Sequence, residues 1–265
     1  MATPAPEALA RLNARYRELF EASALQTLDS VDPLSRRPGM TYLICFGERS
    51  GSTMLSSLMH KTNVLGRPDE FLNPRGVMQR YIAYSHAHDI DEYFHYLRAR
   101  WSTPNGVFGI KVAYMDFAPV LDAGLVDYLF DKPRVIYLNR QDLLRQAVSL
   151  AMARRTGVWF SPTNASASAS NTFVELDEQL VLQAVDKLRR DRESWEAFFA
   201  GRGMEPLRIT YEDVVANHED VLVSIAKFLA VDLDPRSIPS ESEYRSQANS
   251  TNEHWVSEMR KRYNI

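Results

Sequence analysis

Hydrophobic residues follow two alternating patterns along the chain. Short apolar runs rich in β-branched and aromatic residues predict buried strands, and they cover residues 40–47, 106–113, 134–139 and 207–211. Between them, apolar residues recur every three or four positions, which predicts helices. These cover residues 7–28, 77–100, 120–130, 141–155, 176–200 and 218–230, with a further helix from Ser52 onward.

This alternation predicts an α/β fold in which a parallel sheet is flanked by helices. Residues 1–40 precede the first strand and read as an N-terminal helical extension, while 41–265 form the main domain. The stretch 161–172, SPTNASASASNT, is too poor in apolar residues to hold itself in place, and it is either a surface linker or a lid over a site.

Composition narrows the functional classes. The 265 residues carry a net charge of −3, which does not indicate the basic surface that binding to nucleic acid requires. A single cysteine, Cys45, excludes an intramolecular disulfide and a Cys-based zinc site, and its place in the first strand predicts a buried thiol. No apolar run approaches the roughly 18–20 residues of a membrane span, and charged residues interrupt the N-terminus where a signal peptide is apolar. We expect a cytoplasmic protein without transmembrane segments.

The turn after the first strand carries the clearest chemical signal. Residues 47–53 read Gly-Glu-Arg-Ser-Gly-Ser-Thr and lead from a strand into a helix, an arrangement that binds anions through backbone N–H groups. Arg49 adds a cation, and Ser52 and Thr53 add hydroxyl donors. The loop differs from the motif that binds nucleoside triphosphates, because its two glycines are one residue closer to each other and Ser52 stands in the place of the lysine. The alternative is a plain Gly/Ser turn.

A second candidate element follows the strand at 134–139. Arg140 comes directly after this strand, and Ser149 lies nine residues further along the next predicted helix. The two side chains need not share a helix face, but they can meet one ligand if Arg140 lies on the turn before the helix. Taken alone, an arginine at a strand end is more often an ordinary solvated charge.

Together the two elements resemble the sulfotransferases that use 3′-phosphoadenosine-5′-phosphosulfate (PAPS) as donor. That family holds the 5′-phosphosulfate with a [KR]-S-G-[ST]-T loop and the 3′-phosphate with an Arg-x8-Ser element. The chain is similar in particular to the bacterial branch that includes trehalose 2-sulfotransferase, through residues 48–53, 66–71, 105–111 and 247–256. It departs from that branch at Glu48, where Gln is usual, and at Asn139, where His is usual.

The resemblance implies a P-loop-like sulfotransferase fold over 41–265 and transfer of a sulfuryl group from PAPS to a hydroxyl of a carbohydrate or glycolipid. It also implies donor-binding roles for seven residues: Arg49, Ser50, Gly51, Ser52, Thr53, Arg140 and Ser149. Because sulfate monoesters carry less charge than phosphates, and no acidic cluster or histidine motif is visible, we expect no metal. A homodimer is compatible with the sequence.

Three further residues are candidates for the chemistry, with Arg49. Glu70 follows the first βα unit in a Pro-containing turn that can return it toward the strand ends, and it matches the glutamate proposed as base in the resembling branch. Asp69, next to it in the sequence, is the competing candidate for the base. Lys111 ends a buried strand, at the edge where α/β sheets bind ligands, and either stabilises the sulfuryl oxygens or extends into solvent. The aromatic residues Tyr114, Trp159 and Phe160 are either core residues or stacking surfaces.

Two other functions stay open on the sequence alone. One is a nucleotide-dependent phosphotransferase with an aberrant loop, against which the missing lysine counts. The other is a non-catalytic module that binds adenosine 3′,5′-bisphosphate. The sequence does not identify the acceptor, because acceptor pockets are built from variable loops.

Overall fold

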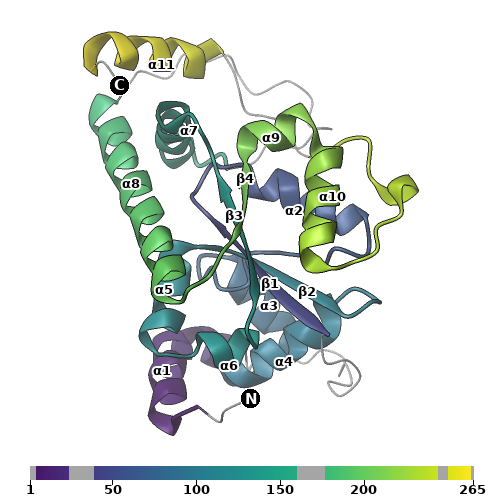
Figure 1. The fold of residues 1–265 in the computed structure, drawn as a ribbon. Coiled ribbons are helices and arrows are strands. Elements are labelled where there is room, and N and C mark those ends of the chain that lie inside the picture. The colour runs from purple at the N-terminus through teal and green to yellow at the C-terminus, as the bar shows by residue number, and fades with distance from the viewer. Residues whose placement is uncertain (1–3, 24–38, 160–176, 244–249, 264–265) are drawn as a thin grey trace.

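A four-stranded parallel sheet forms the centre of the molecule (Figure 1). The computed structural model describes residues 4–23, 39–159, 177–243 and 250–263. The strands are β1 (Met40–Phe46), β2 (Val107–Ala113), β3 (Arg134–Asn139) and β4 (Leu207–Thr210), in the order β2-β1-β3-β4. The register pairs Ile44 with Lys111 on one side and with Ile136 on the other. The α/β fold class predicted from the sequence is confirmed.

Helices cover both faces of the sheet. Successive side chains of β1 point to opposite sides, so they pack into two different hydrophobic clusters. Leu43 and Cys45 pack into one hydrophobic cluster, with α1 (Pro6–Ser23), α3 (Val77–Ser85), α4 (Ile90–Trp101), α5 (Tyr114–Asp122) and α6 (Val126–Phe130). Tyr42, Ile44 and Phe46 pack into a second cluster with α2 (Ser52–Lys61), α9 (Tyr211–Ala216) and α10 (His218–Leu229). Cys45 is buried, as its position inside the first strand predicted, and burial raises the pKa of its thiol.

A third cluster lies away from the sheet. It joins α7 (Leu143–Thr156), α8 (Glu178–Gly201) and the C-terminal α11 (Ser250–Tyr263), and its members include the buried Trp255, Val256 and Met259. Figure 1 shows α8 running along one side of the molecule, with α7 and α11 near its N-terminal end. A short 3₁₀ turn, η1 (Pro235–Ser237), follows α10.

Two predicted helices are each two helices in the structure. The helix expected over 77–100 is interrupted between α3 and α4, where His86 adopts a left-handed φ of 52° and Asp89 caps α4 by accepting from Glu92 N. The helix expected over 120–130 is divided between α5 and α6 around Gly124, whose φ is 71°. The sequence pattern missed both breaks, and it also missed α9, η1 and α11.

The N-terminal helix α1 packs on the same core as the rest of the chain. Its residues Leu12, Tyr16 and Phe20 are buried in the first cluster, and Asn13 Oδ1 accepts a hydrogen bond of 2.9 Å from Ile90 N. The predicted linker or lid at 161–172 lies outside the described residues. None of the described helices is both long enough and apolar enough to cross a membrane.

Candidate active site

A cavity of about 780 Å³ opens at the carboxyl ends of the strands. Phe46 at the end of β1, Ala113 at the end of β2 and Arg140 just after β3 all line it. This is the edge at which open α/β sheets bind ligands. Most of the residues singled out from the sequence line the same cavity: Arg49, Gly51, Ser52, Thr53, Asp69, Glu70, Lys111, Arg140, Ser149 and Trp159.

The loop between β1 and α2 is shaped as an anion site. Arg49 and Gly51 have left-handed φ values of 65° and 82°, and Gly51 is the N-cap of α2 without a side-chain cap. The first amides of a helix have no partner within the helix and carry its positive dipole end. Since Ser52 and Thr53 of this first turn line the cavity, the N-terminus of α2 faces the space where a ligand would lie.

Two arginines approach this helix end from different elements. Arg49 Nε donates to Ser149 Oγ at 3.0 Å, and Arg49 also donates to the backbone carbonyl of Trp159. Burial and the nearby charge of Arg140 lower the pKa of Arg49 to about 10. A buried cation that is further disfavoured by a second cation is what a site for a multiply charged anion requires.

Arg140 lies against the ring of Tyr211, with its guanidinium carbon 4.4 Å from the ring centroid. Its Nε is 4.0 Å from Glu212 Oε1 and makes no hydrogen bond within the described residues. Burial lowers the pKa of this arginine too. The structure therefore brings Arg49, Arg140 and Ser149 to one wall, although Ser149 bonds to Arg49 instead of Arg140.

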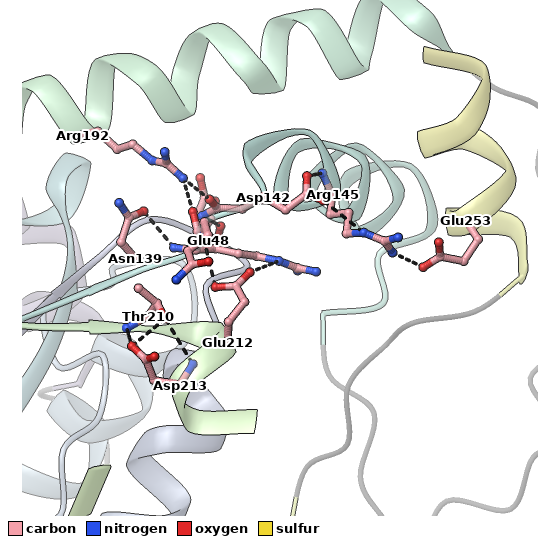
Figure 2. A network of polar contacts seen from close by, with 12 residues as sticks. Glu48, Asn139, Asp142, Arg145, Arg192, Thr210, Glu212, Asp213 and Glu253 are labelled. Atoms are coloured by element: carbon pink, nitrogen blue, oxygen red, sulfur yellow. Dashed lines mark hydrogen bonds and ion pairs between the residues drawn. The ribbon is translucent and has the colours of Figure 1, made fainter. Parts of the chain in front are cut away.

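A network of polar contacts fixes the turn that carries Arg140 (Figure 2). Arg192 donates to the Arg140 carbonyl and to Gln146 Oε1, the latter at 3.1 Å. On the other side, Arg145 lies between Asp142, at 3.1 Å, and Glu253 of α11. The turn is therefore held from α8 and from α11, which orients the Arg140 side chain toward Tyr211.

Glu48 connects the loop between β1 and α2 to the helices α7 and α8. Its carboxylate lies 2.6 Å from Lys187 of α8, and its backbone carbonyl accepts a hydrogen bond of 2.8 Å from Gln146 Nε2. Lys187 also contacts Asp191 at 2.6 Å. The glutamate that replaces the usual glutamine thus forms an ion pair with α8.

Lys111 connects the anion loop to the candidate base. It is buried, and its Nζ donates to Thr53 Oγ1 at 3.0 Å while lying 3.2 Å from Glu70 Oε1. The second oxygen of Glu70 accepts from Asn73 Nδ2 at 2.8 Å. Of the two alternatives for Lys111, extension into solvent is therefore excluded.

Asp69, the competitor of Glu70, is engaged in holding the turn. Its Oδ1 accepts from Glu70 N at 2.8 Å, and its Oδ2 accepts from Tyr81 OH at 2.9 Å. Its backbone carbonyl accepts from Lys111 N at 3.1 Å, so the turn is bound to the edge of β2. This geometry favours Glu70 over Asp69 as the candidate base, because Glu70 has only Lys111 and Asn73 as polar side-chain partners within the described residues.

The cavity residues that sequence reasoning missed include Arg75, Asp116, Tyr211 and Glu253. Asp116 is buried in the first turn of α5, and burial raises its pKa to about 6. Its place three residues beyond β2, at the ligand-binding edge, was the available signal. Of the three aromatic candidates, Tyr114 packs edge-on against Trp195 in the core, Trp159 lines the cavity, and Phe160 lies outside the described residues.

The model of the Stf0 sulphotransferase family matches residues 41–262, and the chain belongs to that family. It is therefore a sulfotransferase by class, as the loop and the Arg-x8-Ser element predicted. Among curated proteins, it is 25% identical to the trehalose 2-sulfotransferase of Mycobacterium tuberculosis over 256 residues, and 26% identical to that of Mycolicibacterium smegmatis over 257 residues. Both alignments cover 83% of this chain and 94% of the relative.

Solved structures give more distant likenesses. The sulfotransferase domain from the curacin biosynthetic pathway is 19% identical, with a TM-score of 0.45 over 82% of this chain and 83% of that one. A retinol dehydratase complex with retinol and PAP is 15% identical, with a TM-score of 0.40 over 94% of this chain and 87% of that one.

Proposed function

We propose that this protein transfers a sulfuryl group from PAPS to a hydroxyl of a carbohydrate or glycolipid, with Glu70 as the general base. The observation that carries the proposal is the position of Lys111, which touches the anion loop through Thr53 and the carboxylate of Glu70 at once. An anion site and a base joined by one buried cation are the parts that sulfuryl transfer to an alcohol requires.

The donor would be held at its two charged ends. The amides and hydroxyls at the N-terminus of α2, with Arg49, suit the phosphosulfate, and Arg140 with Ser149 suits the 3′-phosphate. The Arg49–Ser149 hydrogen bond of 3.0 Å lets the two groups of residues act as one continuous surface. Their combined positive charge matches a donor that carries charge at both ends.

The reaction then needs one proton acceptor. Glu70 takes the proton of the acceptor hydroxyl while the oxygen of that hydroxyl forms a bond to sulfur. The bond between sulfur and the 5′-phosphate oxygen breaks, and adenosine 3′,5′-bisphosphate leaves with that electron pair. Lys111 and the helix N-terminus stabilise the negative charge that develops on the leaving oxygen.

Carbohydrate as the acceptor class rests on the relatives named trehalose 2-sulfotransferase, which align with most of both chains. The phosphotransferase alternative lacks the loop lysine, since Ser52 stands in its place. Within the described residues, no group of three or more His, Cys, Asp or Glu side chains is placed to hold a metal ion.

The test combines sulfur-labelled PAPS with trehalose, glucose, maltose and a trehalose glycolipid, in excess EDTA. We expect labelled sugar product, and calorimetric binding of adenosine 3′,5′-bisphosphate. Loss of activity in EDTA that Mg²⁺ restores, or transfer of phosphate from ATP, would favour the phosphotransferase. Binding of the bisphosphate without transfer to any acceptor would favour the non-catalytic module.

A further inference from the structure

A buried carboxylate beside the candidate base has no part in the mechanism above. Asp116 lines the cavity with Glu70, and its side chain is only 7% exposed. Within the described residues, both hydrogen bonds to Asp116 come from Arg75 Nη2, at 3.3 and 3.4 Å. Arg75 is itself 55% exposed. A carboxylate is rarely buried without close partners, and an ionised one can accept about four hydrogen bonds.

The pair is connected to the proposed base through a short series of contacts. Asn73 Nδ2 donates to Glu70 Oε2 at 2.8 Å, and Asn73 Oδ1 accepts from Arg75 N at 3.0 Å. From Arg75 the series continues to Asp116. Glu70 and the Arg75–Asp116 pair are therefore held by the same turn, so a ligand whose hydroxyl reaches Glu70 presents its neighbouring groups to this pair.

A carboxylate next to a guanidinium offers an acceptor and a donor side by side. A sugar hydroxyl can donate to the first and accept from the second, and charge-assisted hydrogen bonds of this kind are the strong ones. The long contacts between Arg75 and Asp116 leave lone pairs of the carboxylate available on the cavity side.

We propose that Arg75 and Asp116 bind the acceptor hydroxyl adjacent to the one that is sulfated, so that the enzyme selects vicinal diols. This inference rests on the proposed function, because it assumes that Glu70 faces the reacting hydroxyl. Asp116 is in this account a specificity-determining residue that contacts the acceptor, and the donor nucleotide does not reach it.

The charge state of Asp116 supplies a second readout. Burial raises its pKa to about 6, with Arg75 opposing that rise. The other groups that act on it electrostatically come from the loops and from α1 and α8, and they are Glu70, Glu48, Lys187 and Tyr16. As the pH falls through about 6, Asp116 protonates and loses its charge-assisted bonds to the acceptor and to Arg75.

The experiment measures steady-state sulfation of trehalose and its monodeoxy analogues by the full-length wild type, Asp116→Asn and Arg75→Gln. We expect each variant to raise the KM for trehalose by about 10- to 100-fold, with kcat changed far less. Affinity for adenosine 3′,5′-bisphosphate should not change. Asp122→Asn, an exposed carboxylate at the other end of α5, is the matched control and should behave as wild type.

The deoxy analogues make the assignment specific. An analogue that lacks the hydroxyl next to the sulfated position, 3-deoxytrehalose if transfer is to the 2-hydroxyl, should be a poor substrate for the wild type. It should lose no further activity in Asp116→Asn, because the same bond is already missing. The rise in the wild-type KM below about pH 6 should also disappear in Asp116→Asn.

Additive losses in the variant and the analogue, or an unchanged KM in both variants, would overturn the inference and leave the proposed function standing. If the wild type sulfates no sugar of the panel, trehalose included, the proposed function fails, and this inference fails with it because it rests on that function. Because Arg75 is largely exposed, Arg75→Gln keeps the test valid even if Asp116→Asn folds poorly.

Discussion

Glu70 and Asp116 are two carboxylates of one cavity in different surroundings. Glu70 lies 3.2 Å from the ammonium of Lys111. Asp116 is buried, and its hydrogen-bond partner among the described residues is the largely exposed guanidinium of Arg75. Pairs of titratable groups with different environments commonly divide the chemical work of a site. In the proposed mechanism, Glu70 accepts the reacting proton and Asp116 recognises the acceptor.

The burial of Asp116 has a consequence for stability. Because its pKa is raised to about 6, the folded state binds this proton more tightly than the unfolded state, and the contribution of Asp116 to the free energy of unfolding falls as pH rises from about 4 to 6. Asp116→Asn removes that penalty. We expect it to stabilise the protein by on the order of 1–3 kcal/mol above pH 6, with the gain lost toward pH 4. Urea unfolding at pH 4 and pH 7.5 measures this, and destabilisation at pH 7.5 would contradict it.

The two arginines of the anion wall should act on the donor alone. We expect Arg49→Ala and Arg140→Ala each to weaken binding of adenosine 3′,5′-bisphosphate by about 1.5–3 kcal/mol, the scale of charge-assisted hydrogen bonds, and Ser149→Ala to cost less. Titration calorimetry measures the dissociation constants. Arg236→Ala, an exposed arginine paired with Asp234, is the control. Unchanged affinity in both site variants would show that the donor does not bind at this wall.

At the residue scale, the sequence predicted the groups that lie close together along the chain. Gly47 to Thr53 form one turn, so their spacing alone indicated an anion site. Arg75 and Asp116 are 41 positions apart and meet only because the 69–75 turn is bound to the edge of β2. No local pattern reports such a contact.

At the scale of elements, the start of α2 is fixed by a close approach. A Cβ on Gly51 would lie 2.6 Å from Tyr211 Cδ2, and the same tyrosine ring lies under Arg140. The loop, α9 and Arg140 are therefore packed together at one glycine. Any side chain at this position must move Tyr211 or the loop.

Gly51→Ala tests this packing against Gly124→Ala. Both glycines have left-handed φ values, 82° and 71°, so both substitutions carry the backbone strain of about 1–2 kcal/mol. A Cβ on Gly124 would meet nothing within 4 Å. We expect only Gly51→Ala to lose affinity for adenosine 3′,5′-bisphosphate, beyond the loss of stability that the two share. Equal affinities in the two variants would refute the role assigned to this contact.

The predicted elements were most accurate where the pattern was continuous. All four strands were found within a residue or two. The strands β1, β2 and β3 are runs that are buried almost throughout, whereas Ile209 is the one buried residue of the shorter β4. The breaks at His86 and Gly124 were missed, since the apolar spacing continues through them. The C-terminal α11 was missed because most of its residues are polar and only a few, such as Trp255, Val256 and Met259, are buried.

At the scale of the whole molecule, two separately packed parts of the structure contribute residues to the cavity. The sheet and its helices supply the loop, Lys111 and Asp116, while the cluster of α7, α8 and α11 supplies Ser149, Arg145 and Glu253. The C-terminal helix is held by the buried Trp255 and by ion pairs such as Arg260–Asp142, at 2.7 Å. The packing of α11 therefore shapes the part of the cavity that Ser149, Arg145 and Glu253 line.

Trp255→Ala should show that burial, more than surface charge, holds α11 in place. Removing this indole should lower the free energy of unfolding by about 3–5 kcal/mol and speed amide hydrogen exchange in α11. Lys261→Ala, whose ammonium is exposed and paired with Glu258, should change stability by less than about 1 kcal/mol. Urea unfolding and exchange mass spectrometry measure both; equal effects of the two substitutions would contradict the assignment.

In the proposed mechanism, the residues that bind the donor are separate from the base, which does not touch the nucleotide, and Glu70→Gln tests that separation most directly. The substitution keeps the size of the side chain and removes its ability to take a proton. The account predicts that kcat falls by about 10²–10⁴-fold while the dissociation constant for adenosine 3′,5′-bisphosphate stays within about twofold of wild type. A Glu70→Gln enzyme with near-normal kcat would contradict it, and Asp69 would then be the next carboxylate to test.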